Sequence, residues 1–167
     1  MPQIAVVMGS DSDLPVMMKA IATLEEFEVE YEVRVLSAHR TPEETAEFSK
    51  SLEKRGIKIV IAGAGKAAHL PGFIAAFTTI PVIGVPISAS FDGIDALLSI
   101  VQMPPGIPVA TTAVDGAKNA ALLAIEILSL NEEKLRSKLK AYRKRMNQRV
   151  KAKNEQIKRE VEKRCKQ

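Results

Sequence analysis

Hydrophobic and polar positions are arranged along the chain in short blocks that predict alternating strands and helices. Short apolar runs bounded by Gly, Pro or charged residues are typical of buried strands, and apolar positions three or four residues apart are typical of helices. The predicted strands are 4–8, 31–36, 57–62, 81–85 and 107–110. The predicted helices are 14–27, 42–55, 70–77, 92–101 and 116–130. This alternation predicts an α/β fold: a parallel sheet with right-handed crossovers and helices on both faces.

The last segment, residues 131–167, has a different pattern. Its apolar positions step by four or three residues and form a narrow stripe on a polar helix: Leu135, Leu139, Tyr142, Met146 and Val150. Such a stripe predicts an extended C-terminal helix that docks on the body or on a neighbour, with fraying beyond Val150. We therefore expect a single domain over 1–167, with an α/β core at 1–130 and a basic helix and tail at 131–167.

The charge is distributed unevenly between these two parts. Residues 131–167 carry 15 Lys and Arg against 5 Asp and Glu, whereas residues 1–130 hold 9 basic and 15 acidic residues. A basic segment can bind nucleic acid or a membrane surface. No aromatic residues alternate with the basic ones, as they do in many nucleic-acid-binding segments. We interpret the segment as a solvated helix that faces an acidic body or partner subunit, and expect neither nucleic acid nor membrane as a partner.

The composition limits the chemistry further. Hydrophobic residues make up 46% of the chain and aromatic residues 4%, which suits a core of Val, Ile, Leu and Ala. The single cysteine, Cys165, excludes an intrachain disulfide and a cysteine metal cluster, and two separated histidines make a poor zinc site. The start MPQIAVVMGS has no basic region and too short an apolar run for a signal peptide or a membrane span. We expect a soluble, cytoplasmic protein without a bound metal.

Three polar or glycine-containing turns follow the first three predicted strands, at 9–13, 37–40 and 63–69. Ligands of open parallel sheets bind at the carboxyl ends of the strands, so these turns predict a site. In the first turn, MGSDSD, Ser10 and Ser12 offer hydroxyl and N–H groups to a phosphate beside a helix N-terminus. Ordinary N-capping by Ser12 or Asp13 is the alternative. The turn matches neither GxGxxG nor a Walker A sequence, so nothing supports a dinucleotide or ATP site.

The second turn, SAHRTPEE, joins a possible catalytic group to a helix start. Thr41 is expected to N-cap, Pro42 suits the first helical position, and Glu44 completes a capping box. Arg40 can form a bidentate contact with a phosphate or carboxylate. His39 can exchange a proton in both directions near neutral pH. We therefore predict that this turn binds an anion and moves a proton.

The third turn lies in AGAGKAAHLPG, residues 62–72, whose small residues allow the backbone to lie against a flat ring. His69 within it has a structural alternative, a hydrogen bond at a helix start. The connector SIVQMPPGIPVAT, residues 99–111, is rich in proline and is interpreted as shaping the pocket. No Ser-His-Asp or Cys-His arrangement suggests itself.

Five segments in register resemble the PurE family over residues 3 to about 130. They are VVMGSDSDLPVM, SAHRTPE, IAGAGKAAHLPGFIAAFTTIPVIGVP, DGIDALLSIVQMPPGIPVAT and NAALLAIEIL, and the terminal helix resembles the family loosely. The form AAHLPG resembles class I, the N5-carboxyaminoimidazole ribonucleotide mutases. Class II, the aminoimidazole ribonucleotide carboxylases that use free CO2, usually differs in this loop and is the alternative. A non-catalytic flavodoxin-like or nucleic-acid-binding module is a third possibility, which gives no reason for SAHR and AAHLPG to occur together.

The resemblance implies a flavodoxin-like α/β/α sandwich of three layers, assembled as a homo-octamer with active sites between subunits. It implies a step of purine biosynthesis on a small ribonucleotide, in which a carboxylate moves from the exocyclic nitrogen to ring carbon C4. The family needs no metal, ATP or other cofactor for this step. By the same resemblance, His39 is the general acid/base. The residues expected to bind substrate are Ser10, Ser12, Asp13, Ser37, Arg40, Ala64, Gly65, Lys66, Ala67, His69 and Leu70.

Lys66 departs from the family pattern, because class I usually has a second glycine there, as in GAGGAAHLPG. If the position needs a left-handed backbone, the side chain costs roughly 1–2 kcal/mol. A Lys66 side chain that points into the pocket could bind the migrating carboxylate or CO2, whereas one that points out would have no effect.

Overall fold

The computed structural model describes residues 1–164 and contains two compact units, one from Met1 to Leu128 and one that begins at Ser129. The first unit is built on a parallel sheet with the strand order β2-β1-β3-β4-β5. Its strands are β1 (Ile4–Met8), β2 (Tyr31–Val35), β3 (Ile59–Gly65), β4 (Val82–Ile87) and β5 (Ala110–Thr111). The predicted parallel sheet is confirmed. The strand predicted at 107–110 is displaced, because Pro108 has no N–H for the ladder and pairing begins at Ala110.

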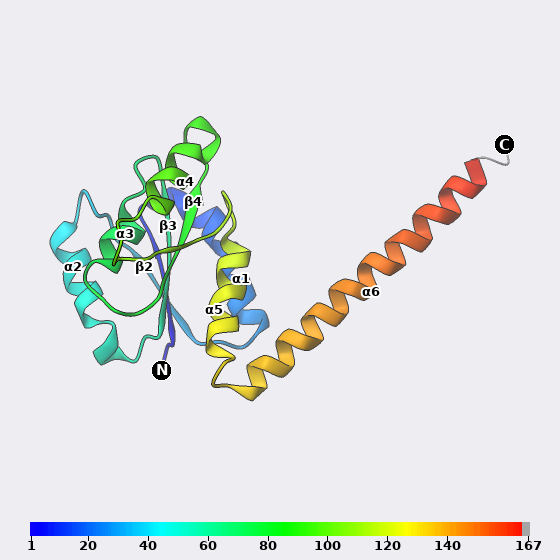
Figure 1. Ribbon diagram of the computed structural model, residues 1–167, viewed down its shortest axis with the longest axis horizontal. Coiled ribbons are helices and arrows are strands. Elements are labelled where there is room, and N and C mark those ends of the chain that lie inside the picture. The colour runs from blue at the N-terminus through cyan, green and yellow to red at the C-terminus, as the bar shows by residue number, and fades with distance from the viewer. Residues whose placement is uncertain (165–167) are drawn as a thin grey trace. The chain divides into compact units, whose positions relative to one another are not determined.

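Helices cover both faces of this sheet (Figure 1). They are α1 (Leu14–Glu26), α2 (Pro42–Ser51), α3 (Leu70–Ala75), α4 (Ile94–Val101) and α5 (Ala117–Leu128). α1 and α5 pack side by side on one face, and α2, α3 and α4 share a core with the other face. The predicted three-layer α/β/α arrangement is therefore confirmed.

The central strands are buried on both faces. Every residue of β1 and β4 is buried, as are the first six residues of β3. Such continuous apolar strands are typical of a parallel sheet between two helical layers. Gly84 in β4 lets α4 approach closely, since a Cβ there would lie 2.4 Å from Cγ2 of Ile100. The sheet is therefore rigidly packed beneath the ends of its strands.

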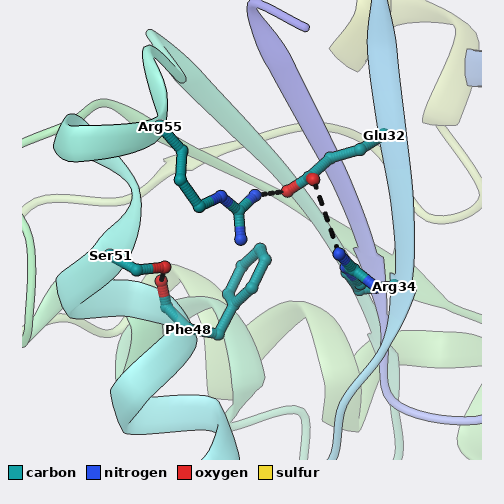
Figure 2. Close-up of polar contacts among 5 residues, drawn as sticks. All are labelled: Glu32, Arg34, Phe48, Ser51 and Arg55. Carbon is teal, nitrogen blue, oxygen red and sulfur yellow. Dashed lines mark hydrogen bonds and ion pairs between the residues drawn. The ribbon is translucent and has the colours of Figure 1, made fainter.

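The edge strand β2 is more exposed and is held by charged side chains (Figure 2). Glu32 of β2 forms ion pairs with Arg55 and, at 3.8 Å, with Arg34. The Arg55 guanidinium also lies 4.9 Å from the centre of the Phe48 ring, so it links α2 to the strand. The chain then leaves this helical region at Gly56, whose φ of 77° is left-handed, as is typical of a glycine that ends a helix.

The second unit contains one long helix, α6 (Glu133–Arg164). Of the predicted stripe, Leu135, Leu139 and Tyr142 are buried, whereas Met146 and Val150 are exposed. The expectation that the helix frays beyond Val150 is wrong, because α6 continues to Arg164.

Side-chain pairs support the continuation of α6. Lys158 lies 3.0 Å from Glu155, and Arg164 lies 3.3 Å from Glu160, at the spacings of three and four residues that support a helix surface. Cys165 lies outside the described residues. Within residues 1–164, no helix combines the length and apolar character needed to cross a membrane.

Candidate active site

A cavity of about 510 Å³ opens at the carboxyl ends of the parallel strands. β1 is flanked by β2 on one side and β3 on the other, so successive connections leave in opposite directions at this point. Such a switch point is where open α/β sheets bind ligands. The cavity lining includes all twelve residues proposed from the sequence: Ser10, Ser12, Asp13, Ser37, His39, Arg40, Ala64, Gly65, Lys66, Ala67, His69 and Leu70.

Three further residues line the cavity: Gly9, Ala38 and Ala89. The first two belong to turns that the sequence had already singled out. Ala89 follows β4 and was missed, because no charged or glycine-rich motif marks it. Ala89 nevertheless lies just beyond the carboxyl end of a parallel strand, where ligands of open parallel sheets bind, so its position could have identified it.

The turn after β1 carries hydroxyl groups and a buried carboxylate. Ser10 N-caps a short 3-10 turn, accepting a hydrogen bond from the Ser12 N–H at 3.3 Å, and its own N–H donates to Oδ2 of Asp13 at 3.1 Å. Ser10 is therefore the cap of this turn, and the Asp13 carboxylate completes its capping box. Asp13 also occupies the N-cap position of α1, without a side-chain capping bond, whereas Ser12 caps neither element. Burial raises the pKa of the Asp13 carboxyl, although backbone hydrogen bonds from Ser10 and Gly9 oppose the shift. The turn thus presents exposed donors beside a partly desolvated acid.

Arg40 connects the turn after β2 to the turn after β1. Its guanidinium donates to the Gly9 carbonyl at 3.1 Å, and its backbone N–H donates to Oγ of Ser37 at 3.2 Å. The predicted capping box with Glu44 is wrong. The Thr41 hydroxyl instead turns back to Ser37, accepting from its N–H at 3.0 Å and donating to its carbonyl at 3.2 Å. These hydrogen bonds hold the loop closed and fix the position of Arg40, whose guanidinium has further N–H groups that can donate to a ligand.

The two histidines of the chain meet in the cavity. Nε2 of His39 lies 2.8 Å from Nδ1 of His69, and the rings are edge-to-face with centroids 4.9 Å apart. One proton occupies this hydrogen bond, so one facing nitrogen donates and the other accepts. His69 stands at the N-cap of α3 without a side-chain capping bond. The structural alternative for His69, a hydrogen bond at its own helix start, is therefore wrong.

The turn after β3 is narrow and made of small residues. A Cβ at Gly65 would lie 3.0 Å from Cβ of Ala89 and 3.2 Å from the Ile87 carbonyl oxygen. Lys66 follows with a φ of 54°, in the left-handed region. The Ala68 N–H then donates to the Lys66 carbonyl at 2.8 Å, and Ala68 is buried. This turn forms a tight wall with a single cation on it.

The cavity therefore combines three kinds of chemistry: donors for an anion on the β1 and β2 side, a proton-exchanging pair, and a wall of small residues. Within residues 1–164, no three His, Cys, Asp or Glu side chains gather as metal ligands would. The arrangement suits an acid–base reaction on an anionic ligand with a flat, compact reacting group.

Known proteins resemble this chain over most of its length. The model of the AIR carboxylase family matches residues 3–149. The N5-carboxyaminoimidazole ribonucleotide mutase of Pyrococcus abyssi is 63% identical over 147 residues, covering 87% of this chain and 84% of the relative. The enzyme of that name from Mycobacterium tuberculosis is 51% identical over 159 residues, covering 95% and 91%. The crystal structure of Treponema denticola PurE superposes with a TM-score of 0.82 at 35% identity, covering 90% of this chain and 94% of that one.

Proposed function

This chain belongs to the AIR carboxylase family, and from that premise we propose that it is an N5-carboxyaminoimidazole ribonucleotide mutase of purine biosynthesis. The reaction moves a carboxylate from the exocyclic nitrogen of the substrate to ring carbon C4. The observation that carries the proposal is the position of His39, in contact with His69 in a cavity that also holds Arg40 and the Ser10–Asp13 turn. Relatives of the same name at 51–63% identity support it.

In the first step of the proposed mechanism, protonated His39 gives its proton to the carbamate nitrogen. The C–N bond then breaks, its electron pair stays on nitrogen, and CO2 is released beside the aminoimidazole ring. A histidine side chain suits this role better than a carboxylate or a lysine, because imidazole exchanges protons near neutral pH. The hydrogen bond to His69 orients the imidazole for the transfer.

In the second step, C4 of the electron-rich ring attacks the carbon of CO2 and forms the new C–C bond. His39, now neutral, removes the proton from C4, which restores the aromatic ring and returns the histidine to its starting state. CO2 must stay beside the ring between the two steps. The small residues Ala64, Gly65 and Ala67 suit this, since a tight wall keeps the fragments oriented and excludes water.

The remaining polar residues are assigned to the ribose phosphate. Ser10, Ser12 and Arg40 supply hydroxyl, N–H and guanidinium donors for the phosphate, and Ser37 holds Arg40 in place through its Oγ. The Asp13 carboxylate is the acceptor for the ribose hydroxyls. Leu70, which is buried at the start of α3, provides an apolar surface for the base.

We also propose that the protein works in the cytoplasm as a homo-octamer. Ile94, Leu98 and Val101 lie on one face of α4 and are each about half exposed, at 51%, 51% and 50%, and the neighbouring Phe91 is 82% exposed. Apolar surface of this kind is covered when copies associate. Light scattering coupled to size exclusion should give about eight times the chain mass of 18.2 kDa.

A carbon-label experiment tests the proposed reaction against the carboxylase alternative. N5-carboxyaminoimidazole ribonucleotide labelled in its carboxylate is offered without ATP, in the presence of unlabelled bicarbonate. A mutase retains most of the label in 4-carboxy-5-aminoimidazole ribonucleotide, because the CO2 stays in the cavity. Complete dilution of the label, or product only from aminoimidazole ribonucleotide plus CO2, would instead make the protein a carboxylase.

A further inference from the structure

Lys66 combines an unfavourable backbone with a functional position. Its φ of 54° lies in the region that glycine adopts freely and that other L-residues seldom adopt. Its side chain is exposed and contributes to the cavity lining, directly after the last residue of β3. A backbone outlier that persists at a ligand cavity is a reason to look for a role of the side chain.

The Lys66 ammonium group is available to a ligand. Within the described part of the chain, its ammonium group takes part in no ion pair. The other cation of the cavity, Arg40, follows β2 and donates to the Gly9 carbonyl. Lys66 instead precedes His69 by three residues, in the turn where the proposed mechanism keeps the reacting carboxylate. The two cations thus come from turns on either side of β1, and the proposed substrate has two anionic groups, a phosphate and a carboxylate.

We propose that Lys66 determines specificity for the carboxylated ribonucleotide, its ammonium group binding the substrate carboxylate while Arg40 binds the phosphate. This inference rests on the proposed function and deepens it. Lys66 then holds the carboxylated substrate and product more tightly than aminoimidazole ribonucleotide, which has no carboxylate. A lysine suits the role because its ammonium is a point charge on a flexible stem, able to follow a carboxylate from nitrogen to carbon.

The test compares ligand binding in the full-length protein and three variants. Lys66→Gly removes the charge and relaxes the backbone, Lys66→Asn removes the charge in a residue that tolerates the left-handed region, and Lys66→Arg keeps the charge. Calorimetry measures Kd for 4-carboxy-5-aminoimidazole ribonucleotide and for aminoimidazole ribonucleotide. We expect the carboxylated ligand to bind about tenfold more weakly to the Gly and Asn variants, the loss of one charge-assisted contact. Binding of the ligand without a carboxylate should change by less than about twofold, and Lys66→Arg should retain most of the preference.

Glu28→Gly is the matched control for the backbone. Glu28 has a φ of 57°, is exposed, and does not line the cavity. Glycine at either position should keep or raise Tm, by up to a few °C, since it relieves a left-handed side chain. Only the Lys66 variant should lose the preference for the carboxylated ligand.

Two failures can be told apart. If the unmodified protein does not convert N5-carboxyaminoimidazole ribonucleotide, the proposed function is wrong. If it does, and the Gly and Asn variants weaken both ligands equally or neither, Lys66 does not recognise the carboxylate and the inference is overturned. Kinetics give a second readout: KM for N5-carboxyaminoimidazole ribonucleotide should rise about tenfold, with kcat changed by less than about threefold.

Discussion

Replacing His39 tests the mechanism most directly, because its contacts separate proton transfer from structure. His39 is exposed, and its side chain makes one hydrogen bond, to Nδ1 of His69 at 2.8 Å. Losing one such hydrogen bond lowers the free energy of unfolding by about 0.5–1.5 kcal/mol. For a chain of this size, that loss lowers Tm by no more than about 6 °C. Losing a general acid/base lowers kcat by roughly 10²–10⁴-fold.

Two substitutions divide these effects. His39→Asn removes both the proton-exchanging ring and the contact with His69. His39→Gln brings an amide nitrogen near the position of Nε2, where it can still donate to His69 but cannot exchange a proton. Both variants should lose kcat by at least about 10²-fold. Only the Asn variant should also lose the small stabilisation from the hydrogen bond.

The assay is the conversion of N5-carboxyaminoimidazole ribonucleotide followed by absorbance, alongside thermal melts and calorimetric binding of the carboxylated product. Intact binding and melting show that a slow variant is folded. If His39→Gln retains more than about a tenth of the activity, His39 acts by hydrogen bonding and the proton-transfer mechanism is wrong. If a variant loses activity only because it no longer folds, His39 has no specific role in the chemistry, and this result would also contradict the proton-transfer mechanism.

Three further predictions concern stability. Gly84→Ala should destabilise by about 1–3 kcal/mol in denaturant titrations, because the new Cβ would meet Cγ2 of Ile100 at 2.4 Å; unchanged stability would mean that α4 moves freely. Burial raises the pKa of Asp13 above 3.8, so ionising this carboxyl destabilises the folded protein. The penalty is absent below pH 3.8 and grows as the pH rises through the raised pKa. In thermal melts, the stability of Asp13→Asn relative to the unmodified protein should therefore increase between pH 3.5 and 7; a decrease over this range would contradict the raised pKa. A double-mutant cycle of Glu32→Gln and Arg55→Met should give a coupling of about 1 kcal/mol, and none if the ion pair is fully screened.

The order of elements and the place of the site could be predicted from the sequence, because both follow from general properties of parallel sheets. Apolar runs mark buried strands, and the carboxyl ends of parallel strands lie on one edge. The turns at 9–13, 37–40 and 63–69 therefore had to lie near one another, and their residues line one cavity.

The ends of the strands were predicted less accurately, because a glycine can mark either a turn or a close approach of another element to a strand. Gly63 and Gly65 were taken as the start of a turn, yet both belong to β3. They are needed there because other elements approach closely: a Cβ at Gly63 would lie 2.5 Å from Sδ of Met17, and one at Gly65 would lie 3.0 Å from Cβ of Ala89. Glycine inside a strand marks such approaches, which depend on the tertiary packing.

The contact between the two histidines could not be predicted either, although each histidine was identified. The residues are 30 positions apart, and propensity or periodicity says nothing about which rotamers meet. Likewise, the Thr41 hydroxyl had an equally good local partner in its own helix, and its bonds to Ser37 depend on how the loop closes.

Strand order explains why this pair can form at all. His39 follows β2 and His69 follows β3, and both strands are neighbours of β1. Two strand spacings of about 4.8 Å separate the loops that follow such strands, a gap of roughly 10 Å that two imidazoles reaching from opposite sides can close. If β2 instead paired beyond β5, three strand spacings, roughly 14 Å, would separate the two loops and the rings could not touch. The Glu32–Arg55 ion pair, which ties the edge strand to the region after α2, therefore bears on the proposed chemistry, because displacement of β2 from β1 would separate His39 from His69.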